Sequence, residues 1–162
     1  MDARRLAVCI ALVGGALTLL ACGPRGRTPG FRLFGDVVQE PVGDWSFADA
    51  YPTIEVETRT WYGIPHSVTT VSFRDGGSLY VPSRTPRDKR WVKNVQRNPR
   101  VRLRIGDRVY EGHAILISDP ERVAELRRAL SARFDRLRTH GDQPELWFFR
   151  IDQGRRTSTI QK

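Results

Sequence analysis

The sequence predicts a mainly β domain with two helices, and three observations carry this prediction. Several short segments alternate apolar and polar side chains with a period of two, which is typical of strands with one solvated face. Turns at Gly76 and Gly106 separate such segments into hairpins. Two other segments change to the spacing of an amphipathic helix, and only the second of them is long.

Six segments are expected to form antiparallel strands. Their ranges are 53–60, 66–74, 79–83, 101–105, 109–117 and 146–151, with 157–160 as a candidate strand beyond Gly154. The first hairpin turns at Asp75-Gly76-Gly77, and Pro82 limits hydrogen bonding, so the returning strand should end at an edge or a bulge. Because each strand has one apolar face and sheet edges need covering, we expect closure into a small barrel.

Both helices have recognisable ends. The first is expected over 86–96, where apolar side chains recur at helical spacing until Asn98-Pro99 stops the run. The second begins with Asp119 as its N-cap and Pro120 in its first position, and it extends to residue 134. The segment 31–51 carries too many large apolar side chains for a free linker, so it should pack against the domain.

Residues 1–21 have the plan of an export signal. A basic start at Arg4-Arg5 precedes an apolar run over 6–21, which falls short of the ~20 residues of a membrane-spanning helix. The run ends in Leu19-Leu20-Ala21-Cys22, which resembles the lipobox, where the cysteine thiol receives a diacylglycerol before cleavage. We therefore expect export, cleavage before Cys22 and a lipid anchor in the inner or outer membrane. The alternative is an ordinary secretory signal with an incidental cysteine.

The mature chain is expected to hold a flexible tether over 22–30 and one domain over 31–162. With Cys22 acylated and Cys9 removed, no thiol remains for a disulfide, a zinc site or catalysis. The formal net charge of +9 for the full chain falls to +8 on cleavage, because Arg4, Arg5 and Asp2 are removed, and so basic a domain would suggest nucleic acid in a cytosolic protein. Export excludes that partner and leaves anionic lipid, cell-wall polymers or phosphate-bearing ligands. The three histidines have no metal-ligand spacing, so no metal site is expected.

A series of short motifs occupies the middle of the chain. They are Asp75-Gly76-Gly77-Ser78-Leu79-Tyr80-Val81, Ser83-Arg84, Trp91-Val92-Lys93-Asn94-Val95 and Asn98-Pro99-Arg100-Val101. The series resembles the flavin-binding split barrel of the pyridoxamine 5′-phosphate oxidase superfamily, nearest its deazaflavin-dependent nitroreductase branch. The resemblance covers about 53–117 and implies a six-stranded antiparallel split β-barrel of the FMN-binding type. Arg84 stands where that branch commonly has lysine, and the loop before Trp91 is shorter.

The resemblance implies that cofactor phosphates lie at the loop and the helix start. The residues agree, because a strand end followed by a helix N-terminus offers free amides and a dipole that favour an anion. The strand from His66 would form a second wall, where this histidine would donate to the ring or help to protonate a substrate. Alternatively, Arg87, Lys89 and Arg90 lie on a solvated helix face, and Trp91 lies in the core. The candidate cofactor-binding residues are Ser83, Arg84, Arg87, Lys89, Trp91, His66 and Thr69, and no catalytic residue is assigned.

Three functions remain open at this point. The first is an oxidoreductase that binds flavin mononucleotide or a deazaflavin, with the hydride chemistry supplied by the cofactor. The second is a non-catalytic envelope lipoprotein that uses the same barrel to bind a small anionic ligand or haem, and the third is a purely structural lipoprotein. The resemblance also implies a homodimer that buries the open cleft of the barrel.

Overall fold

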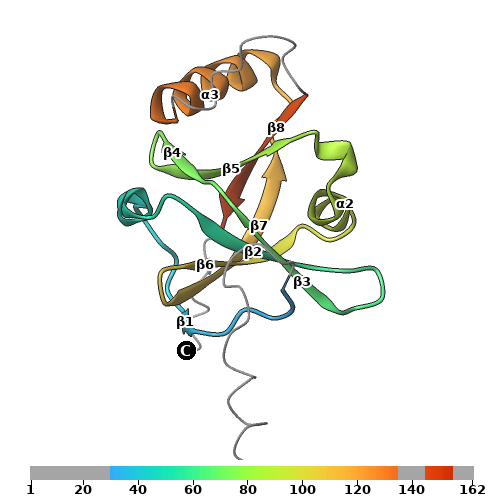
Figure 1. Cartoon of the computed structure of the whole chain (residues 1–162). Coiled ribbons are helices and arrows are strands. Elements are labelled where there is room, and N and C mark those ends of the chain that lie inside the picture. Colours follow the sequence, from blue (N-terminus) through green and yellow to red (C-terminus); the bar gives the residue numbers. More distant parts are fainter. Residues whose placement is uncertain (1–29, 135–144, 155–162) are drawn as a thin grey trace, which may run out of the picture.

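The computed structural model describes residues 30–134 and 145–154. An eight-stranded sheet in the order β3-β2-β6-β7-β8-β5-β4, with β1 beside β7, curls around a core (Figure 1). Its strands are β1 (Asp36–Val38), β2 (Ile54–Arg59), β3 (Pro65–Thr70), β4 (Phe73–Asp75), β5 (Ser78–Arg84), β6 (Arg100–Ile105), β7 (Arg108–Leu116) and β8 (Leu146–Asp152). The helices are α2 (Arg90–Arg97) and α3 (Pro120–Arg133), and two 3₁₀ turns are η2 (Ser46–Ala50) and η3 (Pro86–Asp88).

The prediction of a mainly antiparallel sheet with two helices is confirmed, but the strand count is corrected from six to eight. The segment predicted as one strand over 66–74 divides into β3 and β4, which lie at opposite ends of the strand order. Phe73 of β4 packs into a cluster under α3, whereas Val68 of β3 packs against the main core. The second addition is β1, which pairs with β7 in parallel. Within the described residues, the sheet does not close on itself.

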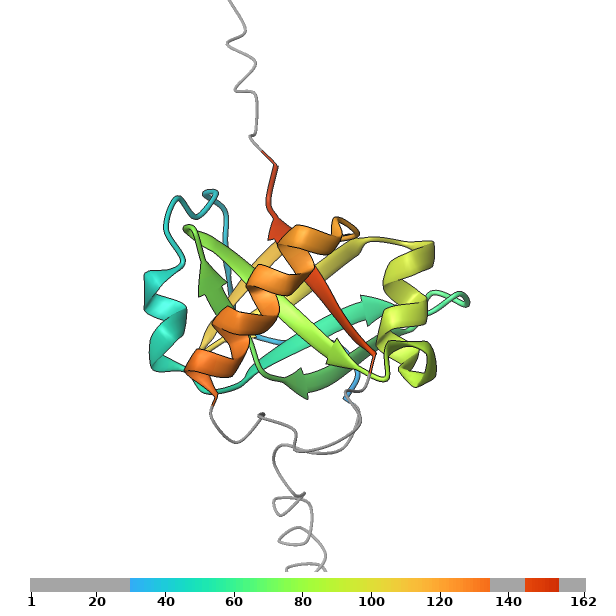
Figure 2. The ribbon, with the colours of Figure 1, turned by 90° about the horizontal axis from the view of Figure 1, so that it is seen from above.

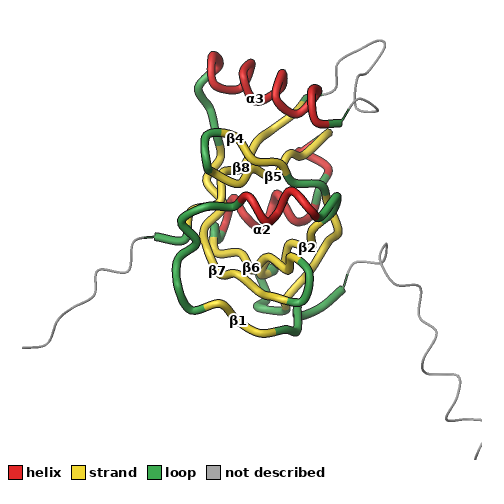
Figure 3. The backbone as a smooth tube through the Cα atoms, turned by 90° about the vertical axis from the view of Figure 1, so that its left-hand side faces the viewer, coloured by secondary structure: helices red, strands yellow, loops and turns green. Residues whose placement is uncertain are grey.

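Two apolar clusters hold these layers together. The main core lies inside the curled sheet and includes Trp91, Val92 and Val95 of α2. The second cluster lies under α3. This helix runs along the outer side of β4, β5 and β8 (Figure 3). The buried members of the second cluster are Phe73, Tyr80, Leu126, Leu130 and Phe148. The strands β5 and β8 therefore separate the two clusters and are covered on both faces.

Local turn and cap chemistry follows the sequence closely in two places. Gly76 and Gly77 adopt φ values of 55° and 80°, which glycine tolerates without strain, and they form the predicted β4–β5 hairpin. The amide of Arg122 donates to Asp119 Oδ2 at 3.1 Å, so the predicted N-cap of α3 is confirmed. Beyond Tyr80, β5 pairs with β8 alone in the described part of the chain, which confirms the predicted edge around Pro82.

The first helix was predicted to begin at residue 86, and this start is wrong. Thr85 adopts a left-handed conformation (φ 47°) and η3 follows it. Lys89 is extended, and α2 begins only at Arg90. The proline at 86 fits the first position of either helix type, which is why the sequence pattern does not separate them. The candidate strand over 157–160 lies outside the described residues.

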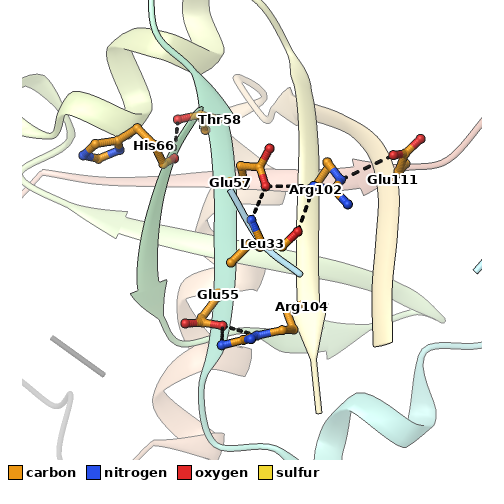
Figure 4. Close-up of polar contacts among 8 residues, drawn as sticks. All are labelled: Leu33, Glu55, Glu57, Thr58, His66, Arg102, Arg104 and Glu111. Carbon is orange, nitrogen blue, oxygen red and sulfur yellow. Dashed lines mark hydrogen bonds and ion pairs between the residues drawn. The ribbon is translucent and has the colours of Figure 1, made fainter. Parts of the chain in front are cut away.

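The N-terminal segment is tied to the outer surface of the sheet. Gly30 exchanges two backbone hydrogen bonds with Ser67 of β3, at 3.0 and 2.8 Å. Leu33 donates its amide to Glu57 Oε2 at 2.6 Å, and its carbonyl accepts from Arg102 at 3.0 Å (Figure 4). Trp45 and Ala48 from the same segment enter the main core, as predicted, whereas Phe34 is 77% exposed. Among the described residues, no helix has the length and apolarity to cross a membrane.

Candidate functional site

The start of α2 lies where the two ends of the curled sheet approach each other. The helix contacts β2 and β3 from one end of the strand order, and η3, which follows β5, from the other. Two views show α2 on the same side of the molecule as the β2–β3 turn (Figures 1 and 2). The structure therefore brings the segment after Ser83 and the strand that carries His66 to one helix, as the predicted site requires.

A chain of hydrogen bonds fixes α2 against this sheet end. The side-chain amide of Asn94 donates to Thr58 Oγ1 at 3.0 Å. The Thr58 hydroxyl in turn donates to the backbone carbonyl of His66 at 3.2 Å. Both side chains are only 2% exposed, so these bonds are shielded from water. These bonds hold α2, β2 and the end strand β3 together beside the candidate site.

Ser83 and Arg84 are neighbours at the end of β5, so their side chains leave the strand on opposite faces. Ser83 is 4% exposed, and its Oγ is buried without a hydrogen-bond partner among the described residues. Arg84 is exposed and has no ion-pair partner within residues 30–134 and 145–154. For both residues to bind the same ligand, the long Arg84 side chain has to bend around the end of the strand toward the Ser83 hydroxyl.

The remaining predicted residues near the helix start divide into two groups. Lys89 is exposed as the residue that precedes α2, and no side chain of the described residues caps the helix there. Arg87 already has other partners, because its Nε donates to Glu145 at 3.0 Å and its guanidinium lies over the Trp147 ring. Trp91 is 5% exposed and packs edge-on against Phe149, with ring centroids 5.2 Å apart, so it occupies a core position.

His66 and Thr69 differ in their surroundings on β3. Thr69 is exposed. His66 is half-buried, and its Nδ1 is buried without a hydrogen-bond partner in the described part of the chain. Burial lowers the pKa of His66 below its ordinary value, and the nearby charge of Arg90 lowers this pKa further. The imidazole is therefore predominantly neutral near pH 7, with one donor and one acceptor nitrogen.

Acidification should cost stability through His66. Because its folded pKa lies below the unfolded value of ~6.5, the unfolded chain binds more protons. The free energy of unfolding should therefore fall as the pH drops from about 7.5 through this unfolded value toward the folded pKa. Urea unfolding at about pH 7.5 and pH 5.5 should show a smaller loss for His66→Gln than for the parent chain. An equal loss in both proteins would contradict this assignment.

A cavity of about 560 Å³ lies elsewhere, between β1, β2, β6 and β7. None of the seven predicted site residues lines it. Its walls mix both signs of charge, and two of its acids, Glu57 and Glu111, already pair with Arg102. The start of α2 is the better candidate for an anionic cofactor, because it combines uncapped helix amides with cations free of ion pairs among the described residues. No group of three or more metal-ligating side chains occurs in the described ranges.

Sequence reasoning missed two contributors to this site, Thr58 and Asn94, which carry the bonds that hold α2 in place. It placed Arg90 near the helix start but did not show that the charge of Arg90 acts on His66. Asn94 offered one signal, because a polar residue between Val92 and Val95 falls on the buried side of the helix. Thr58 offered none, since a threonine in a strand is ordinary.

Solved structures of similar shape establish the fold. A Listeria innocua protein provisionally named a pyridoxamine 5′-phosphate oxidase has 21% identity and a TM-score of 0.52, over 65% of this chain and 86% of that one. An F420 reductase has 17% identity and a TM-score of 0.51, over 72% and 97%. Protein Rv2991 of Mycobacterium tuberculosis has 18% identity and a TM-score of 0.54, over 76% and 86%. These likenesses confirm the predicted split-barrel fold. No curated protein matches the sequence.

The sequence itself identifies the family within this fold. The model of the F420H(2)-dependent quinone reductases matches residues 52–139, from just before β2 to beyond α3. This match spans more than half of the 162 residues and contains the motif series from Asp75 to Val101. The predicted resemblance to deazaflavin-dependent enzymes is therefore confirmed, and the chain belongs to the F420H(2)-dependent quinone reductase family.

Proposed function

We propose that this protein is a deazaflavin-dependent oxidoreductase that binds F420 at the start of α2 and reduces a quinone-type acceptor. Family membership over 52–139 supports the cofactor and the reaction class. The observation that carries the location is the Ser83 hydroxyl, which is buried without a hydrogen-bond partner among the described residues, just before η3 and α2. A buried hydroxyl without a hydrogen-bond partner destabilises the fold unless a bound ligand supplies that partner.

The surrounding donor set fits an anionic cofactor tail. The first amides of α2 have no side-chain cap from the described part of the chain, and the helix dipole favours negative charge at this end. Arg84, Lys89 and Arg90 add positive charge, and none has an ion-pair partner within 30–134 and 145–154. Arginine can bind a phosphate through two parallel hydrogen bonds. The site thus offers mainly donors and cations to a ligand that has mainly acceptors.

Each side chain has a distinct part in this proposal. Arg84 and Lys89 would bind the phosphate of the tail, and Ser83 would donate its hydroxyl to the same group. His66 would hold the edge of the ring through Nδ1, which the neutral imidazole leaves available as donor or acceptor. Trp91 would keep α2 in position through its contact with Phe149. When bound, reduced F420 would supply the hydride for the acceptor.

Parallel titrations with F420, flavin mononucleotide, riboflavin and haem test this proposal. The full chain should bind F420 most tightly of the four. Flavin mononucleotide should bind better than riboflavin, because the two differ only in the phosphate. Equal binding of the two flavins would contradict the phosphate site. Binding of haem alone would favour the non-catalytic alternative.

We further propose that the protein is a lipoprotein anchored through Cys22, on the strength of the lipobox-like ending of residues 19–22. The mature protein should partition into detergent, because acyl chains bury apolar surface in a bilayer. The Cys22→Ser variant should lose this partitioning. Intact-mass measurement of the purified protein checks the modification, and an unmodified Cys22 would contradict the anchor.

A homodimer is also proposed, because the resemblance implies a two-fold dimer that buries the open cleft of the barrel. Light scattering of the purified chain should give the mass of a dimer at roughly tens of micromolar, where a standard-size interface persists. A monomeric mass at this concentration would count against the dimer.

A further inference from the structure

The turn between β2 and β3 exposes three large apolar side chains. Trp61 is 78% exposed, Tyr62 52% and Ile64 47%. The Trp61 and Tyr62 rings contact each other edge to face, with centroids 5.1 Å apart. Single exposed apolar residues are ordinary, but three within four positions of one turn form a local apolar surface. We call Trp61, Tyr62 and Ile64 the aromatic tip.

The N-terminal segment adds an exposed ring next to β3, the strand that follows this tip. Phe31 is 75% exposed, although the backbone on both sides of it is fixed. Gly30 exchanges two hydrogen bonds with Ser67, and Leu33 is bonded through both its amide and its carbonyl. Ser67 of β3 follows Ile64 by three residues, which corresponds to roughly 10 Å of extended chain. The backbone on both sides of Phe31 is therefore fixed within roughly this distance of the tip, and a loose chain end does not explain the exposure of the ring.

Positive charge accompanies these aromatic side chains. Arg32 follows Phe31, and Arg59 precedes the tip by two residues. Both are exposed, and neither has an ion-pair partner within residues 30–134 and 145–154. Tryptophan and tyrosine rings favour the headgroup level of a bilayer, and nearby basic side chains are attracted to anionic lipid. Aromatic rings combined with unpaired cations match this interface in both polarity and charge.

The position of Gly30 supplies an independent argument. The chain leaves the described domain at Gly30, which pairs with Ser67 of β3, the strand that follows the tip. Only residues 23–29 lie between Gly30 and Cys22, which directly follows the apolar run. The eight steps along the chain from Cys22 to Gly30 span at most roughly 29 Å when fully extended. A bilayer that receives the N-terminal part of the chain therefore lies within reach of the tip.

We propose that the aromatic tip, together with Phe31, seats the domain on the surface of an anionic bilayer. Trp61 and Tyr62 would lie at headgroup level, with Arg32 and Arg59 against lipid phosphates. This second contact with the membrane would orient the domain, which an acyl chain on a linker does not do. The tip and α2 lie on one side of the molecule (Figures 1 and 2), so the seated domain would hold its candidate cofactor site toward the lipid.

Tryptophan fluorescence in vesicles that contain phosphatidylglycerol and brominated lipid tests the proposal on the full chain. Trp45 and Trp91 are only 4% and 5% exposed and should be insensitive to the lipid. Subtracting the emission of the Trp61→Phe variant isolates the signal of Trp61. We expect brominated lipid to lower this signal about twofold or more, as for a ring at headgroup level. The Trp147→Phe variant is the matched control and should retain the full Trp61 quenching.

Three outcomes would overturn the proposal. The first is protein that does not float with the vesicles, and the second is protein that floats while the Trp61 signal stays unquenched. The third is a dimer in light scattering that Trp61→Ser/Tyr62→Ser converts into a monomer, because a second copy then covers the tip. Circular dichroism checks that the variants fold, which is expected because Trp61 lies outside the core. F420 binding is measured without vesicles, so failure of the proposed enzyme function is distinguishable from failure of seating.

Discussion

Replacing Arg102 by alanine should lower the free energy of unfolding by about 3 kcal/mol, because the change strands a buried carboxylate. Glu57 is 7% exposed and accepts hydrogen bonds from Arg102 at 3.0 Å and from the amide of Leu33 at 2.6 Å. Arg102 also donates to the Leu33 carbonyl, so one guanidinium ties the N-terminal segment to two strands (Figure 4). Removal of the Arg102 side chain leaves the Glu57 carboxylate without its ion pair and the Leu33 carbonyl without this hydrogen bond, and it creates a cavity.

The neighbouring pair on the same two strands provides the control. Arg104 of β6 pairs with Glu55 of β2 in the same way, but these side chains are 38% and 27% exposed. Solvent screens such a pair, and Arg104→Ala should cost less than about 1 kcal/mol. Urea unfolding of both variants measures the difference. Equal costs would show that burial of Glu57 does not determine the energetics of this network.

The Arg84→Ala variant should bind F420 at least about tenfold more weakly than the parent chain. A charge-assisted hydrogen bond contributes about 1.5 to 3 kcal/mol, which corresponds to a factor of roughly ten or more in affinity. Arg84 is exposed and forms no ion pair within 30–134 and 145–154, so its loss should leave the stability almost unchanged. Isothermal titration calorimetry measures the affinity, and urea unfolding measures the stability.

Two further variants separate a local effect from a general loss of positive charge. Arg128 is exposed on α3, and Arg128→Ala should leave F420 affinity unchanged. Ser83→Ala should weaken binding without destabilising the protein, because the buried Ser83 hydroxyl has no partner to lose among the described residues. If Arg128→Ala weakens F420 binding as much as Arg84→Ala does, the effect is nonspecific electrostatics and the assigned site is wrong.

The parts of the fold that the sequence predicted are those determined by local chemistry. The hairpin at Gly76 and Gly77 needs positive φ values, and the cap at Asp119 needs a side-chain acceptor, so residue type alone indicates both. The break at Val71 and Ser72 has no such signal, because valine and serine are compatible with a continuing strand. It arises because Phe73 joins the cluster under α3, which is a contact between distant segments.

The candidate site shows the same division between local and distant information. The motif around Ser83 and Arg84 identified a strand end followed by a helix, and the structure has this arrangement. The sequence did not show that Arg87 pairs with Glu145, because 58 residues separate the two side chains. Nor did it show that Thr58 and Asn94 connect α2 to β3, since this depends on how the sheet curls.

The oxidation of F420H2 by a water-soluble quinone, followed through the return of the absorbance of oxidised F420, tests the central claim most directly. The proposed function predicts a rate that rises in proportion to the concentration of the full chain. The Ser83→Ala/Arg84→Ala double variant should lose most of this rate while remaining folded by circular dichroism. A rate no higher than that of buffer alone, with folded protein and saturating cofactor, would contradict the claim that this chain is an F420-dependent oxidoreductase.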